Sequence, residues 1–273
     1  MGLVSDVIKD TFMFWKSYFS KIVQYQLIFL VFYLVGILLF APLLFWIGIS
    51  IIGVELLPFP VVLISIIAGV VVLIASYGAQ IGGYSLIFYQ LDKTGRFNLL
   101  EAVKKAFKKV HKILAVMILS GIVFAPVFVS ILVGIFLTGM LGSISEIVYS
   151  MVIFIIVLIV GLIVGIYVTS RLSISIPILM IEERGCIESL KKSWAQTKGK
   201  ILGILGASFV VGLIVSIVSS IVSFVVSLSL VLFLPYVSPV GSLVGNLISY
   251  LFFQPVTAFV PVVIYYNLRS TKK

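Results

Sequence analysis

The sequence predicts an all-α integral membrane protein. Six transmembrane helices are expected, arranged as three parallel repeats of an amphipathic interfacial helix followed by a transmembrane hairpin, with both termini cytoplasmic. Three observations predict this fold: an apolar composition, six long apolar segments and a charged heptad that occurs three times. Of the 273 residues, 62% are hydrophobic and 10% are charged, whereas a soluble domain carries about 25% charged residues. The chain therefore has too little polar surface for a water-soluble domain.

The apolar segments predict helices, because they lack the alternation of barrel strands and are much longer than about 10 residues. A helix also satisfies its own backbone hydrogen bonds inside a bilayer. The expected spans are residues 25–51, 60–90, 113–136, 147–180, 201–234 and 243–268. Several exceed the roughly 20 residues that cross a bilayer, so tilt, proline breaks or projection into the interface must absorb the excess. Breaks are expected at Pro42, Pro126, Pro177, Pro255 and Pro261.

The first apolar segment is too long for a cleaved secretory signal, whose apolar core has about 7–15 residues. We expect it to remain in the protein as the first span.

A charged heptad precedes each pair of spans. Residues 6–12 (DVIKDTF), 101–107 (EAVKKAF) and 188–194 (ESLKKSW) share one order: acidic, any residue, aliphatic, lysine, two residues, aromatic. The chain is thus expected to be a single polytopic domain with repeat units of about 1–92, 93–183 and 184–273. Units of two spans keep the same orientation in the membrane. Recurrence by coincidence stays open, because amphipathic helices beside membrane spans are common.

The heptads lie on amphipathic segments, with apolar residues at helical spacing and lysines on the other face. This pattern is typical of helices that lie in the membrane interface. The second such helix is expected to begin with a capping box of Asn98 and Glu101. The expected interfacial anchors are Phe12, Phe107 and Trp194.

The basic residues predict the orientation. All 19 lie on alternate connections: three before the first span, seven in residues 93–112, six in residues 171–200 and three from residue 269 onward. The opposite turns carry only Glu55 and Glu146. By the positive-inside rule, we expect a multi-pass protein of the cell membrane with cytoplasmic N- and C-termini.

Two segments resemble a known family. Residues 188–199 (ESLKKSWAQTKG) and 261–269 (PVVIYYNLR) are similar to signatures of the glycerophosphodiester phosphodiesterase membrane-domain family. The chain looks like a standalone, archaeal-like member without the phosphodiesterase barrel that this module precedes in some members. The resemblance implies a six-span module associated with membrane lipid or headgroup metabolism, and it does not carry over catalysis.

The residues themselves predict no enzyme. No phosphate-cradling loop, metal-binding histidine pair or nucleophile elbow is present, and His111 and Cys186 are the only residues of their types. We expect no cofactor and no metal.

Membrane lipids are the expected partners, because lysines beside membrane spans meet anionic headgroups before nucleic acid. Homo-oligomerisation stays open. The expected headgroup- or anion-binding residues are Arg171, Lys104, Lys105, Lys108, Lys191 and Lys192.

Arg171 lies about nine residues before the end of the fourth apolar segment. In one interpretation the span ends there and the side chain extends to the interface. In the other, Arg171 binds a phosphate at the cytoplasmic mouth of a cavity.

Polar residues within the spans also have two interpretations. They either form hydrogen bonds between helices and allow close helix packing, or they line a wet cavity. The residues concerned are Tyr77, Gln80, Tyr84, Ser216, Ser220, Asn246 and Gln254. We therefore expect a non-enzymatic module that engages anionic headgroups. The alternative is a small-solute channel or transporter with a polar cavity between the spans.

Overall fold

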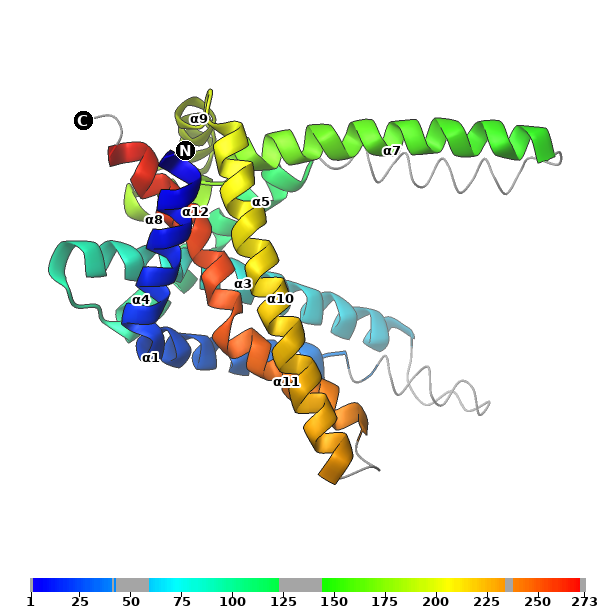
Figure 1. Cartoon of the computed structure of the whole chain (residues 1–273), viewed down its shortest axis with the longest axis horizontal. Coiled ribbons are helices and arrows are strands. Elements are labelled where there is room, and N and C mark those ends of the chain that lie inside the picture. Colours follow the sequence, from blue (N-terminus) through cyan, green and yellow to red (C-terminus); the bar gives the residue numbers. More distant parts are fainter. Residues whose placement is uncertain (1, 41, 43–58, 123–143, 234–237, 271–273) are drawn as a thin grey trace.

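The structure, a computed structural model, describes residues 2–40, 42, 59–122, 144–233 and 238–270 (Figure 1). This part of the chain is helical and contains no strand. Five segments are long and apolar enough to cross a membrane: Gly2–Leu38, Pro60–Thr94, Leu158–Ile181, Ile201–Leu230 and Val244–Arg269. These segments support a multi-pass membrane protein. Most of the third expected span, residues 113–136, lies outside the described residues.

The first two helices are α1 (Gly2–Leu38) and α3 (Phe59–Thr94). Helix α1 contains the amphipathic segment and the first part of the expected first span, and the two parts meet at a kink. The kink is at Tyr18, whose φ of −120° and ψ of 19° leave the helical range. The stretch around Pro42 and the expected turn at residues 53–60 lie largely outside the described residues.

The next four helices are α4 (Leu99–Lys108), α5 (Val110–Gly121), α7 (Ile144–Leu172) and α8 (Ser175–Ile181). The predicted cap of α4 is confirmed on one side, because Asn98 Oδ1 accepts a hydrogen bond from the Glu101 backbone N–H. The sequence predicted an amphipathic helix that begins here and continues to the start of the third span. Instead the helix breaks at Lys109, with φ −100° and ψ 5°. The basic residues are therefore divided between α4 and α5.

The last four helices are α9 (Cys186–Gln196), α10 (Ile201–Phe233), α11 (Ser238–Phe252) and α12 (Gln254–Ser270). The predicted break at Pro255 is confirmed between α11 and α12. Pro261 lies inside α12 and does not end it. The break attributed to Pro177 lies upstream, between α7 and α8. A proline clashes with the carbonyl four residues before it, and the break leaves Pro177 in the first turn of α8, where a missing N–H is tolerated.

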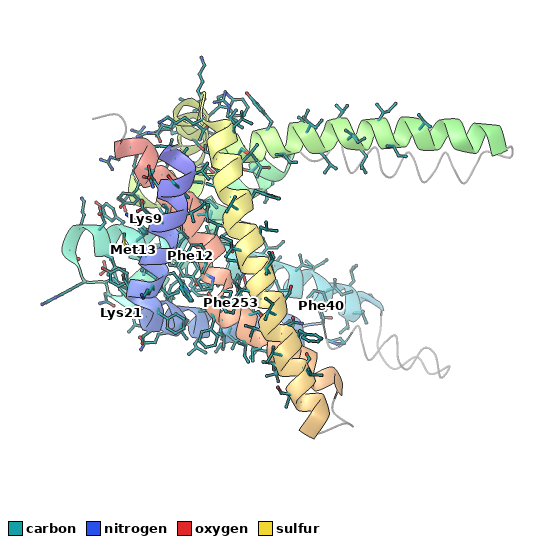
Figure 2. All side chains as sticks on the ribbon, in the orientation of Figure 1. Lys9, Phe12, Met13, Lys21, Phe40 and Phe253 are labelled. Atoms are coloured by element: carbon teal, nitrogen blue, oxygen red, sulfur yellow. The ribbon has the colours of Figure 1, made fainter. Side chains whose placement is uncertain are left out.

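The buried core lies at one end of the helix assembly. We call this end the basic end, because the lysines of α4, α5 and α9 lie there. Here α3 meets α4, α5 and α8, and α9 packs on α5 and α8. Helices α1 and α12 pack against each other and against α3 and α10. The largest fully buried side chains include Tyr25, Tyr84, Ile113, Ile178 and Phe259. Away from this end the helices diverge, and apolar side chains stand out from both sides of α7 (Figure 2). Such outward apolar surface is what a lipid environment covers.

Candidate functional site

Two lysine-bearing segments of the chain adjoin at the basic end: α4 with α5, and α9. Cys186, the first residue of α9, lies beside the start of α5, with its Sγ 3.5 Å from the Lys112 carbonyl oxygen. Lys109 Nζ lies 3.0 Å from Glu183 Oε1. We call the lysines of this region the basic collar. Its members are Lys104, Lys105, Lys108, Lys109, Lys112, Lys191 and Lys192.

Ion pairs divide the basic collar into two sets. Lys105 lies 2.7 Å from Glu101, and Lys109 and Lys192 pair with Glu183 and Glu182. A hydrogen bond to Glu101 raises the pKa of Lys105, and one from Lys109 lowers the pKa of Glu183. The second set has exposed side chains and no carboxylate within ion-pair distance among the described residues: Lys104, Lys108, Lys112 and Lys191. These four ammonium groups are available to an external anion.

Glu182 connects three helices at the basic end. Lying just after α8, it pairs with Lys192 of α9 and accepts a hydrogen bond of 2.9 Å from the Tyr265 hydroxyl of α12. Arg184 Nε lies 2.8 Å from the same carboxylate. Burial acts to raise the pKa of Glu182, but the hydrogen bonds from Lys192, Arg184 and Tyr265 outweigh it and lower the pKa. The group therefore stays ionised.

Arg171 is buried, with 7% of its surface exposed. Helix α7 ends one residue later, at Leu172, but the apolar segment that could cross a membrane continues to Ile181. The Arg171 side chain does not extend into solvent. Its guanidinium lies 4.9 Å from the Trp194 ring centroid, and its Nη1 donates to the Trp194 carbonyl at 3.0 Å. The Arg171 carbonyl in turn accepts from Ser193 at 2.7 Å and Thr197 at 3.1 Å. Arg171 thus joins α7 to α9.

Two of the three expected interfacial anchors pack within the protein. Phe107 stacks on Phe29 of α1, with ring centroids 5.7 Å apart and planes at 2°, and lies 4.8 Å from the Phe32 ring. Phe12 is partly buried against the core. Trp194 is 41% exposed. The sequence pattern shows that a helix face is apolar, but it cannot distinguish a lipid surface from a neighbouring helix.

Several of the polar span residues form a buried hydrogen-bonded network. Gln26 is its centre: its Nε2 donates to Gln254 Oε1 at 3.0 Å, and its Oε1 accepts from Gln80 Nε2 at 2.5 Å and from the Tyr84 hydroxyl. Tyr33 donates to Gln80 Oε1 at 3.1 Å. Three of these residues were expected from the sequence, whereas Gln26 and Tyr33 were missed. Their i, i+7 spacing within an apolar segment was the available signal.

The remaining polar span residues lie elsewhere. Tyr77 is exposed on the outer face of α3, and Ser216 is exposed on α10. Ser220 and Asn246 line a groove of about 390 Å³ between α10 and α11. A Cβ on Gly245 would lie 2.7 Å from Ser223 Oγ. Small residues thus let these two helices approach closely, and the groove is separate from the Gln26 network.

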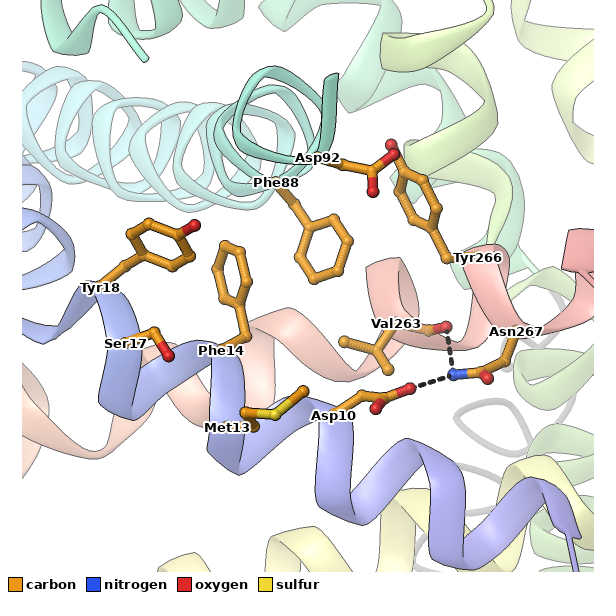
Figure 3. Close-up of a pocket in the computed structure, with 10 residues that line it drawn as sticks. All are labelled: Asp10, Met13, Phe14, Ser17, Tyr18, Phe88, Asp92, Val263, Tyr266 and Asn267. Atoms are coloured by element: carbon orange, nitrogen blue, oxygen red, sulfur yellow. Dashed lines mark hydrogen bonds between the residues drawn. The ribbon is translucent and has the colours of Figure 1, made fainter. Parts of the chain in front are cut away.

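A second cavity lies between the first half of α1, the end of α3 and α12 (Figure 3). We call it the acidic pocket; its volume is about 460 Å³. It is lined by Asp10, Met13, Phe14, Ser17, Tyr18, Phe88, Asp92, Val263, Tyr266 and Asn267. The sequence did not predict this pocket, because its two carboxylates belong to segments more than 80 residues apart. The two carboxylates form one site only because the fold brings their segments together.

Among the described residues, no group of three or more His, Cys, Asp or Glu side chains could hold a metal ion.

Comparison of the chain with protein-family models, with curated proteins and with solved structures gives no match in any of the three. Function is therefore inferred from the geometry of the chain itself.

Proposed function

We propose that the protein is a non-enzymatic, multi-pass module of the cell membrane that binds anionic lipid headgroups through its basic collar. The proposal includes six spans in three parallel units, with the basic end and both termini in the cytoplasm. The family resemblance to membrane domains of glycerophosphodiester phosphodiesterases is part of the same proposal. It favours a role in a process that involves membrane lipids.

The observation that carries the proposal is the set of four exposed lysines that form no ion pair among the described residues: Lys104, Lys108, Lys112 and Lys191. In the proposed topology these lysines lie beside the cytoplasmic ends of the spans, at the level of the lipid phosphates. A lysine near an anionic membrane surface contributes about 1 kcal/mol. Four such groups on three neighbouring helices, α4, α5 and α9, therefore favour phosphate-bearing headgroups over uncharged ones.

The test compares lipid retention by native mass spectrometry after purification in phosphatidylglycerol mixed with an uncharged glycolipid. Changing the four unpaired lysines to glutamine should lower retained phosphatidylglycerol at least about fivefold, the factor that corresponds to 1 kcal/mol. Glycolipid retention should not change.

A matched control removes the same charge elsewhere at the basic end. It replaces four exposed residues outside the basic collar with glutamine: Lys9, Lys16, Lys93 and Arg96. An equal loss of phosphatidylglycerol in both variants would show general electrostatic attraction and overturn the assignment to the collar.

The serine-lined groove between α10 and α11 favours the second candidate, a small-solute channel or transporter. Its test is solute flux in proteoliposomes, with Ser220→Trp expected to block it. Flux that survives Ser220→Trp and Gln80→Leu would contradict this alternative.

A further inference from the structure

The acidic pocket has a charge opposite to that of the protein. The chain carries 19 basic and 9 acidic residues, yet Asp10 and Asp92 line this pocket and no lysine or arginine among the described residues does. Lys9 and Lys93 directly adjoin the two aspartates in sequence but do not line the pocket. The Nζ of Lys93 lies 4.6 Å from the Tyr89 ring centroid. The two carboxylates therefore have no ion pair within the described part of the chain.

Aromatic rings form the walls of the acidic pocket. Phe14 of α1 and Phe88 of α3 stack with centroids 4.3 Å apart, and Phe88 lies 4.8 Å from Tyr266 of α12. Tyr18 lies 5.0 Å from Phe14. One continuous ring cluster thus holds three helices around the cavity and fixes its shape.

The polar groups of the pocket are only partly satisfied. Asp10 Oδ2 accepts one hydrogen bond of 3.2 Å from Asn267 Nδ2 (Figure 3). The buried hydroxyl of Tyr266 has no partner among the described residues. A carboxylate can accept about four hydrogen bonds, so acceptor capacity remains for a ligand that donates.

We propose that the acidic pocket binds an organic ammonium group. Aromatic faces attract cations through the ring quadrupole, and ammonium N–H groups donate to carboxylates in strong, charge-assisted hydrogen bonds. The volume of about 460 Å³ is within the range of small-molecule sites, about 300–1,000 Å³, and exceeds what one metal ion needs. The ammonium comes either from a phospholipid headgroup or from a soluble amine.

The experiment uses the full chain in phosphatidylglycerol nanodiscs with two probes: phosphatidylethanolamine added to the bilayer, and free ethanolamine added to the solution. Each is read out as a shift of the thermal unfolding midpoint, and the lipid also by native mass spectrometry. A shift with phosphatidylethanolamine alone assigns the pocket to a lipid headgroup, and a shift with both assigns it to a soluble amine. No shift with either probe overturns the proposal.

The variant Asp10→Asn/Asp92→Asn keeps the side-chain shapes and removes both charges. We expect it to lower the affinity for the active probe about tenfold or more and to leave phosphatidylglycerol retention unchanged. The matched control, Asp6→Asn/Glu188→Gln, removes two exposed carboxylates that do not line the pocket and should bind as the unmodified protein does. Equal binding by both double variants overturns the proposal.

A second variant shows whether a loss of binding in the first is caused by a folding defect. Ser17 is exposed and lines the pocket, so Ser17→Trp should obstruct the cavity without altering either carboxylate. We expect the probe-induced shift to disappear while the unfolding midpoint without probe stays unchanged. A full shift in Ser17→Trp would place amine binding outside the pocket.

Discussion

Arg171 shows how a single charge is accommodated near the hydrocarbon region. Burying a cation without a partner is costly, and no carboxylate among the described residues pairs with Arg171. Its guanidinium instead lies against the rings of Tyr167 and Trp194 and donates to the Trp194 carbonyl. The arginine therefore gains both cation–π attraction and a charge-assisted hydrogen bond.

Replacing Arg171 with alanine should destabilise the protein by about 1.5–3 kcal/mol, the usual range for hydrogen bonds to charged groups. The measurement is the free energy of unfolding in mixed detergent and SDS micelles. Tyr167→Phe removes only a hydroxyl and should cost less. If Arg171→Ala instead lowers phosphatidylglycerol retention at unchanged stability, the phosphate-binding interpretation replaces this structural one.

Glu182 makes stability depend on pH. Its pKa is lowered below the usual 4.5 in the folded protein, so its contribution to stability is complete above that value and is lost as the pH falls through the folded pKa. We expect the unfolding midpoint to fall in acid below about pH 4.5, with each partly exposed pair contributing at most about 1 kcal/mol.

In Glu182→Gln the acid-dependent fall should be shallower, because the titrating carboxyl is gone. Glu188, exposed and without an ion pair among the described residues, provides the control Glu188→Gln. Parallel pH curves for the unmodified protein and Glu182→Gln would contradict the role of Glu182.

At the scale of helices, glycine sets how closely α1 and α3 approach. The Tyr25 hydroxyl of α1 reaches the α3 backbone and lies 3.3 and 3.2 Å from the carbonyl oxygens of Ala79 and Gln80. A Cβ at Gly83 would overlap that hydroxyl. The contact therefore requires a residue without a side chain at position 83.

Gly83→Ala should destabilise the protein by about 1–3 kcal/mol, the usual cost of overpacking a core. At Gly212, in α10, an added Cβ would have no neighbouring atom within 4 Å among the described residues. Gly212→Ala should therefore be neutral or stabilising by up to about 1 kcal/mol from helix propensity. Comparing the two unfolding free energies in mixed micelles checks this. Similar values would mean that α1 and α3 do not approach closely at Gly83.

At the scale of the whole molecule, the distribution of buried residues separates two environments. The core lies at the basic end, where helices from the N-terminal, central and C-terminal thirds of the chain meet. The outer parts of the long helices expose apolar side chains such as Leu38, Ile64, Ile163 and Phe224. Protein packing thus holds the basic end together, and lipid is left to cover the rest.

The proposed orientation is tested with cysteine labelling. Cys186 is the only cysteine and lies at the basic end, so a membrane-impermeant maleimide should label it from the cytoplasmic side only. In a Cys186→Ser background, Glu55→Cys should be labelled only from outside intact cells. Labelling of both positions from the same side would overturn the topology.

Much of the fold could be predicted from the sequence, because it depends on interactions between residues that are close together in the chain. Apolar length identified the long helices, Asn98 marked a helix start, and Pro255 marked a break. The break before Pro177 was displaced because the steric conflict acts on the preceding turn. The kink at Tyr18 and the break at Lys109 had no comparable local signal, because packing among neighbouring helices fixes them.

Long apolar helices, with basic charge on alternate connections, could be inferred from the amino-acid sequence, since helix periodicity and transfer free energy are properties of each segment alone. Which polar groups meet became clear from the folded structure. It joined Gln26 to Gln80 and Gln254, packed Phe107 against α1 and set Asp10 and Asp92 around one pocket. Such contacts depend on the relative positions of distant segments, and no local pattern encodes those positions.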